Sequence, residues 1–176
     1  AMDLNKDPFL VEGARLLPDV PWGPKDPGVA YNAMIAPIIN FRIAGALWYQ
    51  GESNTGLDKY YKQLLTSLIK SWRNAWKYDF PFYFVQIAPY QYGKPLICPK
   101  LQNAQRLVKE VNAGMVVIND IGDTSDIHPK NKIEVANRLA NMALAKHYNK
   151  TGISFSGPLY REMKLEQNGI RVLFDF

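Results

Sequence analysis

Two short polar segments of this chain carry residue types that could perform acyl-transfer chemistry. The first, at residues 50–54 (QGESN), directly follows an apolar run of strand length, and the second lies at residues 126–129 (DIHP). Ester hydrolysis by acyl transfer requires a nucleophile, a base, a group that orients the base, and donors that face the developing oxyanion. The chain offers candidates for three of these four roles. We therefore expect both segments to belong to one active site.

His128 is the candidate base, because it lies in a polar loop between an apolar strand and a long helix. Side chains in such loops project over the carboxyl edge of a sheet. Two aspartates compete to orient its imidazole: Asp126, two positions before it, which we favour, and Asp123, five positions before it. The aspartate that is not used could cap the helix or bind loop amides. Asp120 belongs to the same acidic cluster.

Gln50 is the candidate oxyanion donor, since its amide can reach a substrate oxygen from a strand end without carrying charge. A glutamine here could also simply bond to its own loop. We expect Glu52 to fix the turn and Asn54 to cap the following helix. Ser53 is disfavoured as the nucleophile, because Thr55 stands where a Gly-x-Ser-x-Gly turn requires its second glycine.

The sequence contains no pattern typical of metal or phosphate chemistry. Its two histidines and its single cysteine, Cys98, are far apart in sequence, and His147 near the end of a long helix is assigned no role. We expect no metal and no cofactor. Five aromatic residues could include a sugar-stacking face, although we expect most of them to pack in or around the core: Trp48, Tyr49, Tyr83, Tyr90 and Tyr92.

The composition is that of one soluble globular domain, with 47% hydrophobic and 21% charged residues. No apolar run approaches the roughly 18 residues that a membrane-spanning helix needs, so we expect no membrane partner. The formal charge of +5 comes from Lys and Arg residues that are scattered among acids. This distribution does not favour a nucleic-acid partner.

The apolar periodicity alternates between strand-length runs and amphipathic helices. Strands are predicted over residues 43–49, 82–88 and 115–121, and helices over 29–39, 57–76, 101–112 and 131–148. This alternation is typical of right-handed crossovers and a parallel sheet that is covered on both faces. The predicted fold class is therefore α/β, a three-layer Rossmann-like sandwich.

The chain divides into three predicted parts. Residues 1–28 are rich in proline and should form an irregular surface segment, whereas 29–157 form the α/β domain. In residues 158–176, alternating apolar residues around Asn168-Gly169 predict a β-hairpin with a type I′ turn. This last part is either a terminal hairpin or the start of a β-rich domain.

Four motifs, taken in their order and spacing, resemble the sialate O-acetylesterase family, a branch of the SGNH hydrolases that removes acetyl groups from sugars. They lie at residues 31–37, 48–54, 80–82 and 126–130. The resemblance implies a flavodoxin-like α/β fold, with His128 as the base. It places Gln50 where other SGNH enzymes have an asparagine. The SGNH aspartate, three positions before the histidine, is replaced here by Ser125.

Family members carry the nucleophilic serine and an oxyanion glycine upstream of the motifs present here. The resemblance thus implies an incomplete parallel sheet, a nucleophile outside this chain, and chain ends that are cuts in a longer protein. That protein would be a bacterial esterase of the periplasm or the extracellular space, acting on O-acetylated sialic acid or a similar sugar, although this chain shows no signal peptide.

One further expectation follows from an incomplete sheet, and one alternative function remains open. Apolar surface left exposed by the missing strand and helix favours a homodimer, domain swapping, or binding of the missing N-terminal segment. The alternative function is a noncatalytic domain, degenerate or carbohydrate-binding, in which the same turns only support the fold.

Overall fold

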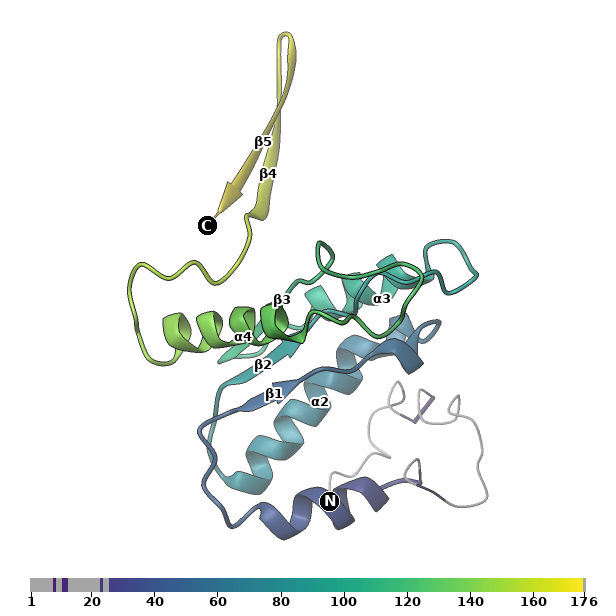
Figure 1. Cartoon of the computed structure of the whole chain (residues 1–176), viewed down its shortest axis with the longest axis vertical. Helices are drawn as coiled ribbons and strands as arrows, with labels where there is room; N and C mark the ends of the chain where they lie inside the picture. Colours follow the sequence, from purple (N-terminus) through teal and green to yellow (C-terminus); the bar gives the residue numbers. More distant parts are fainter. Residues whose placement is uncertain (1–7, 9–10, 13–22, 24–25, 176) are drawn as a thin grey trace.

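The computed structural model describes residues 8, 11–12, 23 and 26–175, so the predicted segment 1–28 lies mostly outside the described residues. Figure 1 shows an α/β body from which a β-hairpin projects. The body contains a parallel sheet in the order β1-β2-β3, formed by β1 (Ala46–Trp48), β2 (Phe82–Val85) and β3 (Ala113–Val116). The central strand, β2, is buried along its whole length.

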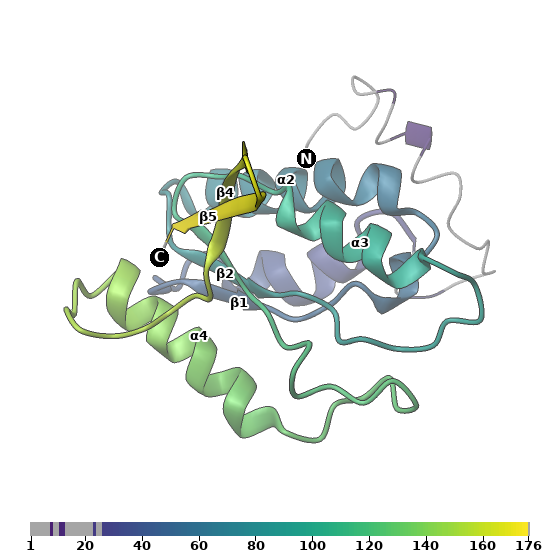
Figure 2. The same ribbon diagram turned by 90° about the horizontal axis from the view of Figure 1, so that it is seen from above.

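Helices cover both faces of this sheet (Figure 2). Helices α2 (Asp58–Trp76) and α3 (Ile97–Arg106) pack together on one face, and α4 (Lys132–Lys146) lies on the other. Alternate residues of β2 enter different cores: Phe82 and Phe84 pack with α2 and α3, whereas Tyr83 and Val85 pack with α4. A strand that is buried on both faces has a continuous apolar sequence. The predicted three-layer α/β fold is confirmed.

Helix α2 begins within one residue of its prediction, because its apolar side chains recur at three- and four-residue spacing. It ends where Lys77 adopts a left-handed backbone, with φ of 60°. The prediction that Asn54 caps this helix is wrong. The short 3-10 turn η4 (Glu52–Asn54) intervenes, and the N-cap position falls on Leu57, whose side chain makes no cap hydrogen bond.

The other predicted elements are correct in type but differ in their bounds. The strands are shorter, and β3 starts two residues before the predicted range of 115–121. Helix α3 starts four residues before the predicted 101–112, directly after Leu96 turns the chain with φ of 62°. It ends at Arg106, six residues before the predicted end. The predicted helix over 29–39 contains a π-helical turn, η2 (Tyr31–Ile35), and a 3-10 turn, η3 (Ala36–Ile38).

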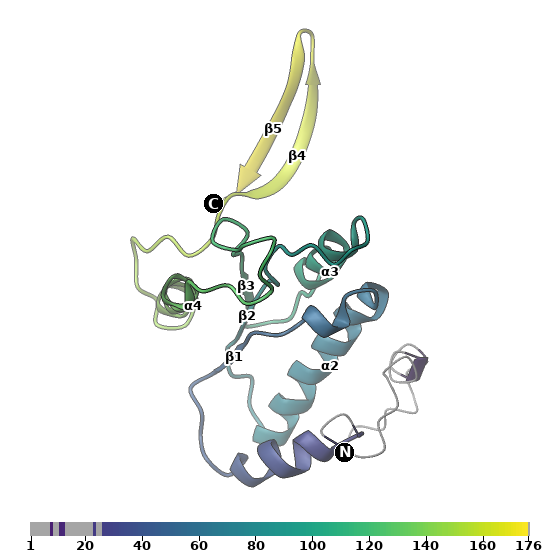
Figure 3. The ribbon, with the colours of Figure 1, turned by 45° about the vertical axis from the view of Figure 1, so that its right-hand side comes forward.

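The predicted C-terminal hairpin is present, but its turn is not the predicted one. Strands β4 (Leu159–Glu166) and β5 (Gly169–Asp175) pair antiparallel in a separate two-stranded sheet that projects from the body (Figure 3). Gly169 pairs with Glu166, so the loop consists of Gln167 and Asn168. Neither of these loop residues has a positive φ. A type I′ turn requires positive φ at both central positions, so that prediction is wrong.

Large apolar side chains are exposed at the edge of the sheet and on the hairpin. Leu47 of the edge strand β1 is 64% exposed, and Leu165 of the hairpin is 80% exposed. These observations agree with the expected exposure of apolar surface, while the oligomeric state remains a prediction. Within the described part of the chain, no helix is long and apolar enough to cross a membrane.

Tyr61 connects helix α2 to the loop that follows β1. Its side chain is only 3% exposed, and its hydroxyl donates a 2.8 Å hydrogen bond to the main-chain oxygen of Gln50. Burial raises the pKa of Tyr61 to about 12 from its ordinary value of 10.0. The phenol therefore stays protonated in the folded protein at pH values where an unfolded chain would release the proton.

Replacing Tyr61 by Phe tests this connection. At pH 8 we expect Tyr61→Phe to lower the free energy of unfolding by about 1–2 kcal/mol, because the hydrogen bond is lost. The difference from the parent should shrink as pH rises from 10 toward 12. In this range the unfolded parent loses the Tyr61 proton before the folded parent does, so the free energy of unfolding of the parent falls as pH rises. The variant has no hydroxyl at this position and does not show this fall.

Urea denaturation at a series of pH values measures both effects. Tyr148→Phe, at a residue that is 55% exposed, serves as the control and should match the parent throughout. A difference between Tyr61→Phe and parent that is constant from pH 8 to pH 12 would contradict the assignment.

Candidate active site

Gly51 lets the loop after β1 approach the segment that follows β2. A Cβ atom at this position would lie 2.6 Å from Cγ2 of Ile87 and 3.2 Å from Nε2 of Gln105. A contact of 2.6 Å is shorter than real Cβ atoms make, so any larger residue here would have to displace Ile87. Gln50, the residue before it, is thereby held against the carboxyl end of the sheet.

The Gln50 side chain is positioned by Asn54. Nε2 of Gln50 donates a 2.6 Å hydrogen bond to Oδ1 of Asn54, and Oε1 lies 3.5 Å from the Tyr61 hydroxyl. Asn54 therefore orients the amide instead of capping the helix as predicted. An amide nitrogen carries two hydrogens, so the second hydrogen of Gln50 can still donate to another oxygen.

Gln105 is a structural residue of the site that sequence reasoning did not single out. It is completely buried on α3, and its Oε1 accepts a 2.9 Å hydrogen bond from the main-chain N–H of Ile87. Its Nε2 lies 3.3 Å from the oxygen of Val85 and 3.4 Å from that of Gln50. One amide thus connects the segments that follow β1 and β2. The available signal was a glutamine on the apolar stripe of a helix.

Glu52 fixes its turn through the main chain, since its carbonyl accepts hydrogen bonds from the Thr55 hydroxyl and main-chain N–H. The carboxylate is half-buried and acts at longer range. Together with burial, which is the larger cause, its negative charge raises the pKa of Tyr49, Tyr92 and Cys98.

Asp126 lies beside His128. Its Oδ1 accepts a 2.9 Å hydrogen bond from the main-chain N–H of His128 and is 4.0 Å from Nδ1 of the imidazole. The His128 side chain is 89% exposed. At 4.0 Å, Nδ1 and the carboxylate do not form a hydrogen bond.

The other two aspartates of the cluster have different partners. Oδ1 of Asp123 accepts hydrogen bonds from the main-chain N–H and the hydroxyl of Ser125, which lower the pKa of the Asp123 carboxyl. Asp120 forms a two-pronged ion pair with Arg138, whose hydrogen bonds lower the pKa of Asp120 to about 2. Of the three aspartates, Asp126 is the one whose carboxylate lies 4.0 Å from the imidazole of His128.

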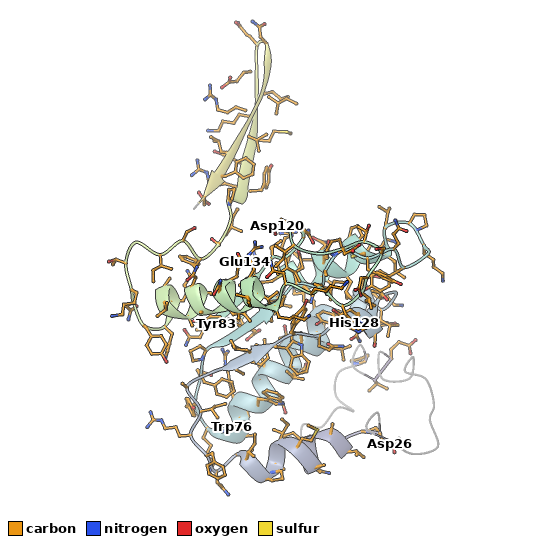
Figure 4. The ribbon with its side chains drawn as sticks, in the orientation of Figure 1. Asp26, Trp76, Tyr83, Asp120, His128 and Glu134 are labelled. Carbon is orange, nitrogen blue, oxygen red and sulfur yellow. The ribbon has the colours of Figure 1, made fainter. Side chains whose placement is uncertain are left out.

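The loops that follow the three parallel strands meet at one edge of the sheet. Nζ of Lys132, four residues after His128, lies 4.7 Å from the ring centre of Tyr49, the neighbour of Gln50. The main-chain N–H of Gln91 donates a 3.0 Å hydrogen bond to the oxygen of Thr124. Figure 4 shows His128 outside the N-terminal end of α4, on the side where β1 ends. The structure thus places both predicted segments at the same edge.

Most of the candidate sugar-stacking aromatics belong to the core or its rim, as expected. Trp48 packs against Trp72 and Phe82, and Tyr83 is 5% exposed. Tyr90 and Tyr92 lie in the loop after β2 and form an edge-to-face pair. Ser53 is exposed within η4. In the described ranges, no three His, Cys, Asp or Glu side chains are grouped so that they could hold a metal ion.

Comparisons with known proteins identify the family. Residues 13–145 match the family described as carbohydrate esterase, sialic acid-specific acetylesterase. The sialate O-acetylesterase of Mus musculus is 34% identical over 184 residues, which cover 89% of this chain and 33% of the mouse protein. That of Homo sapiens is 32% identical, covering 81% of this chain and 32% of the human protein.

A solved structure gives the same assignment. XAC1771, a carbohydrate acetylesterase from Xanthomonas citri, superposes with a TM-score of 0.75 at 34% sequence identity, covering 82% of this chain and 35% of that chain. The present chain spans about one third of the length of these relatives. With its α/β fold and its two polar segments at one sheet edge, the chain belongs to the sialic acid-specific acetylesterase family of carbohydrate esterases.

Proposed function

We propose that this chain supplies the base, the orienting carboxylate and an oxyanion donor to a site that hydrolyses acetyl esters on sugars. The nucleophilic serine would come from polypeptide outside residues 1–176. The observation that carries the proposal is the meeting of the His128 loop and the Gln50 turn at one carboxyl edge. Family membership and the names of the acetylesterase relatives support the reaction class.

His128 would act as the general base. Because its Nδ1 is the nitrogen near Asp126, Nε2 is left to take the proton of the attacking serine hydroxyl. The Asp126 carboxylate would hold the tautomer with hydrogen on Nδ1 and stabilise the imidazolium that forms. The high exposure of the imidazole leaves it accessible to a serine on another segment.

Gln50 would donate its second amide hydrogen to the carbonyl oxygen of the acetyl group. Serine attack turns this oxygen into an oxyanion, and a donor that is already oriented stabilises the negative charge without reorganisation. His128 would then protonate the sugar oxygen that leaves, and the acetyl group would remain on the serine. A water molecule, deprotonated by His128, would release acetate and restore the free serine.

Ser53 is a poor alternative to an external serine. It lies in a 3-10 turn that is followed by Thr55 in extended conformation, with ψ of 129°. A nucleophile elbow instead leads from a strand through a tight turn directly into a helix. The residues between η4 and α2 therefore disfavour Ser53 as the nucleophile.

A chimera tests the proposed roles. Residues 31–157 replace the matched region of XAC1771, so that the rest of that acetylesterase completes the site. We expect acetate release from O-acetylated sialic acid or an aryl acetate. His128→Ala should lower kcat at least about 10³-fold, because no base remains, and Gln50→Leu should lower kcat about 10²-fold, because one oxyanion donor is lost.

The control for this chimera is His147→Ala, at the C-cap of α4, which should leave kcat unchanged. Undiminished turnover by the His128→Ala chimera would overturn the assigned base. Turnover by the isolated 176-residue chain that disappears in Ser53→Ala would overturn the external serine. A folded chimera without any esterase activity would favour the noncatalytic alternative.

Asn substitutions separate the two candidate acids. Asn keeps an oxygen that can accept the loop hydrogen bond but removes the charge. In the chimera, Asp126→Asn should lower kcat about 10²- to 10⁴-fold, as expected when a base loses its orienting carboxylate. Asp123→Asn should change kcat less than about threefold, because Asp123 bonds to Ser125. Initial rates of acetate release decide between them, and the reverse ranking would assign the role to Asp123.

A further inference from the structure

The loop between β2 and α3 forms a hollow whose lining residues have no role in the proposed reaction. Residues 90–99 line this hollow, whose volume is about 380 Å³. The loop leaves the carboxyl end of the central strand, so its neighbours on either side are the loops that carry Gln50 and His128. The loop that forms the hollow is therefore a neighbour of both polar segments.

Contacts on both sides of the loop agree with this position. On the side of the His128 loop, Gln91 bonds to Thr124, and a Cβ at Gly122 would lie 2.6 Å from Cδ of Pro89. On the side of the Gln50 turn, a Cβ at Gly56 would lie 3.7 Å from Cδ1 of Ile97, which lines the hollow. The hollow thus lies between the two segments of the candidate site.

The lining of the hollow combines an aromatic pair with one cation. The rings of Tyr90 and Tyr92 stand nearly perpendicular, with centres 4.9 Å apart. The Tyr92 hydroxyl is buried, so Tyr92 is the inner ring of the pair. Lys94 is the charged side chain of the lining, and it is exposed. Among the described residues, no hydrogen bond or ion pair involves its ammonium group.

We propose that this hollow binds the sugar ring of the substrate and that Lys94 pairs with the carboxylate of an acidic sugar such as a sialic acid. The inference rests on the proposed acetylesterase function. Aromatic side chains offer apolar surface to the C–H groups of a sugar ring, while a few polar groups set its orientation. An ammonium–carboxylate contact adds favourable binding free energy that a neutral sugar cannot gain. Lys94 would therefore determine specificity and take no part in the chemical step.

The other nearby lysines already have neighbours. Lys132 lies over the Tyr49 ring, and the charge of Lys130 acts on Asp123. Lys100, on the exposed side of α3, does not line the hollow and provides a matched control. These differences single out Lys94 as the lysine that can meet a carboxylate in the hollow.

The test is an NMR titration of the 176-residue chain with N-acetylneuraminic acid and, separately, with its methyl ester, which lacks the charge. Lys94→Gln should raise Kd for the acid by about three- to fivefold, the effect of one exposed ion pair, and leave Kd for the ester unchanged. Lys100→Gln should match the parent with both ligands. Tyr90→Ala should weaken both ligands equally, because the ring contact does not depend on charge.

Several outcomes would overturn the proposal. These are a parent chain that binds neither sugar, perturbed resonances that lie outside residues 90–99, and a Lys94→Gln variant that binds the acid like the parent or loses both ligands equally. Acetate release by the XAC1771 chimera keeps the two proposals separate. An active chimera with no Lys94-dependent binding would reject only the sugar subsite, and Lys94-dependent binding with an inactive chimera would reject only the esterase function.

Discussion

The fully buried amide of Gln105 is the interaction on which the carboxyl edge of this structure depends. It satisfies the main-chain N–H of Ile87 and lies close to the oxygens of Val85 and Gln50, which belong to two different strand ends. A buried polar group that loses its partner is costly, so the two strand ends must keep their positions together. The absence of a side chain at Gly51 permits this close approach.

The two halves of the candidate site differ in how they are held. Gln50 is constrained from several sides, because Asn54 bonds to its amide and Tyr61 bonds to its main-chain oxygen. His128, in contrast, projects into solvent and is supported by Asp126 through the main chain. An oriented amide and an accessible imidazole are what a reaction with a serine from another segment would require.

Much of the fold was predictable from the sequence, and the errors have local causes. The strongly periodic α2 and the continuously apolar β2 were predicted correctly in type and nearly in position, because their patterns reflect burial on one face or on both. The start of α3 and the hairpin turn were misplaced. In both cases backbone angles at a few residues decided the outcome: a left-handed Leu96, and a loop at Gln167 and Asn168 without positive φ.

The sequence by itself determined the element types, the α/β class and the residues that could do chemistry, at positions 50, 126 and 128. Periodicity and residue chemistry are local properties, so they can be read from the sequence. Only the tertiary structure decided which partners these residues have. It assigned Asn54 to Gln50, Ser125 to Asp123 and Arg138 to Asp120, and it placed the 90–99 loop between the two polar segments. The pairing of Arg138 with Asp120 and the position of the 90–99 loop depend on packing between distant segments, which no local pattern encodes. The pairings of Asn54 and Ser125 are local, and they depend on the backbone conformation of their turns.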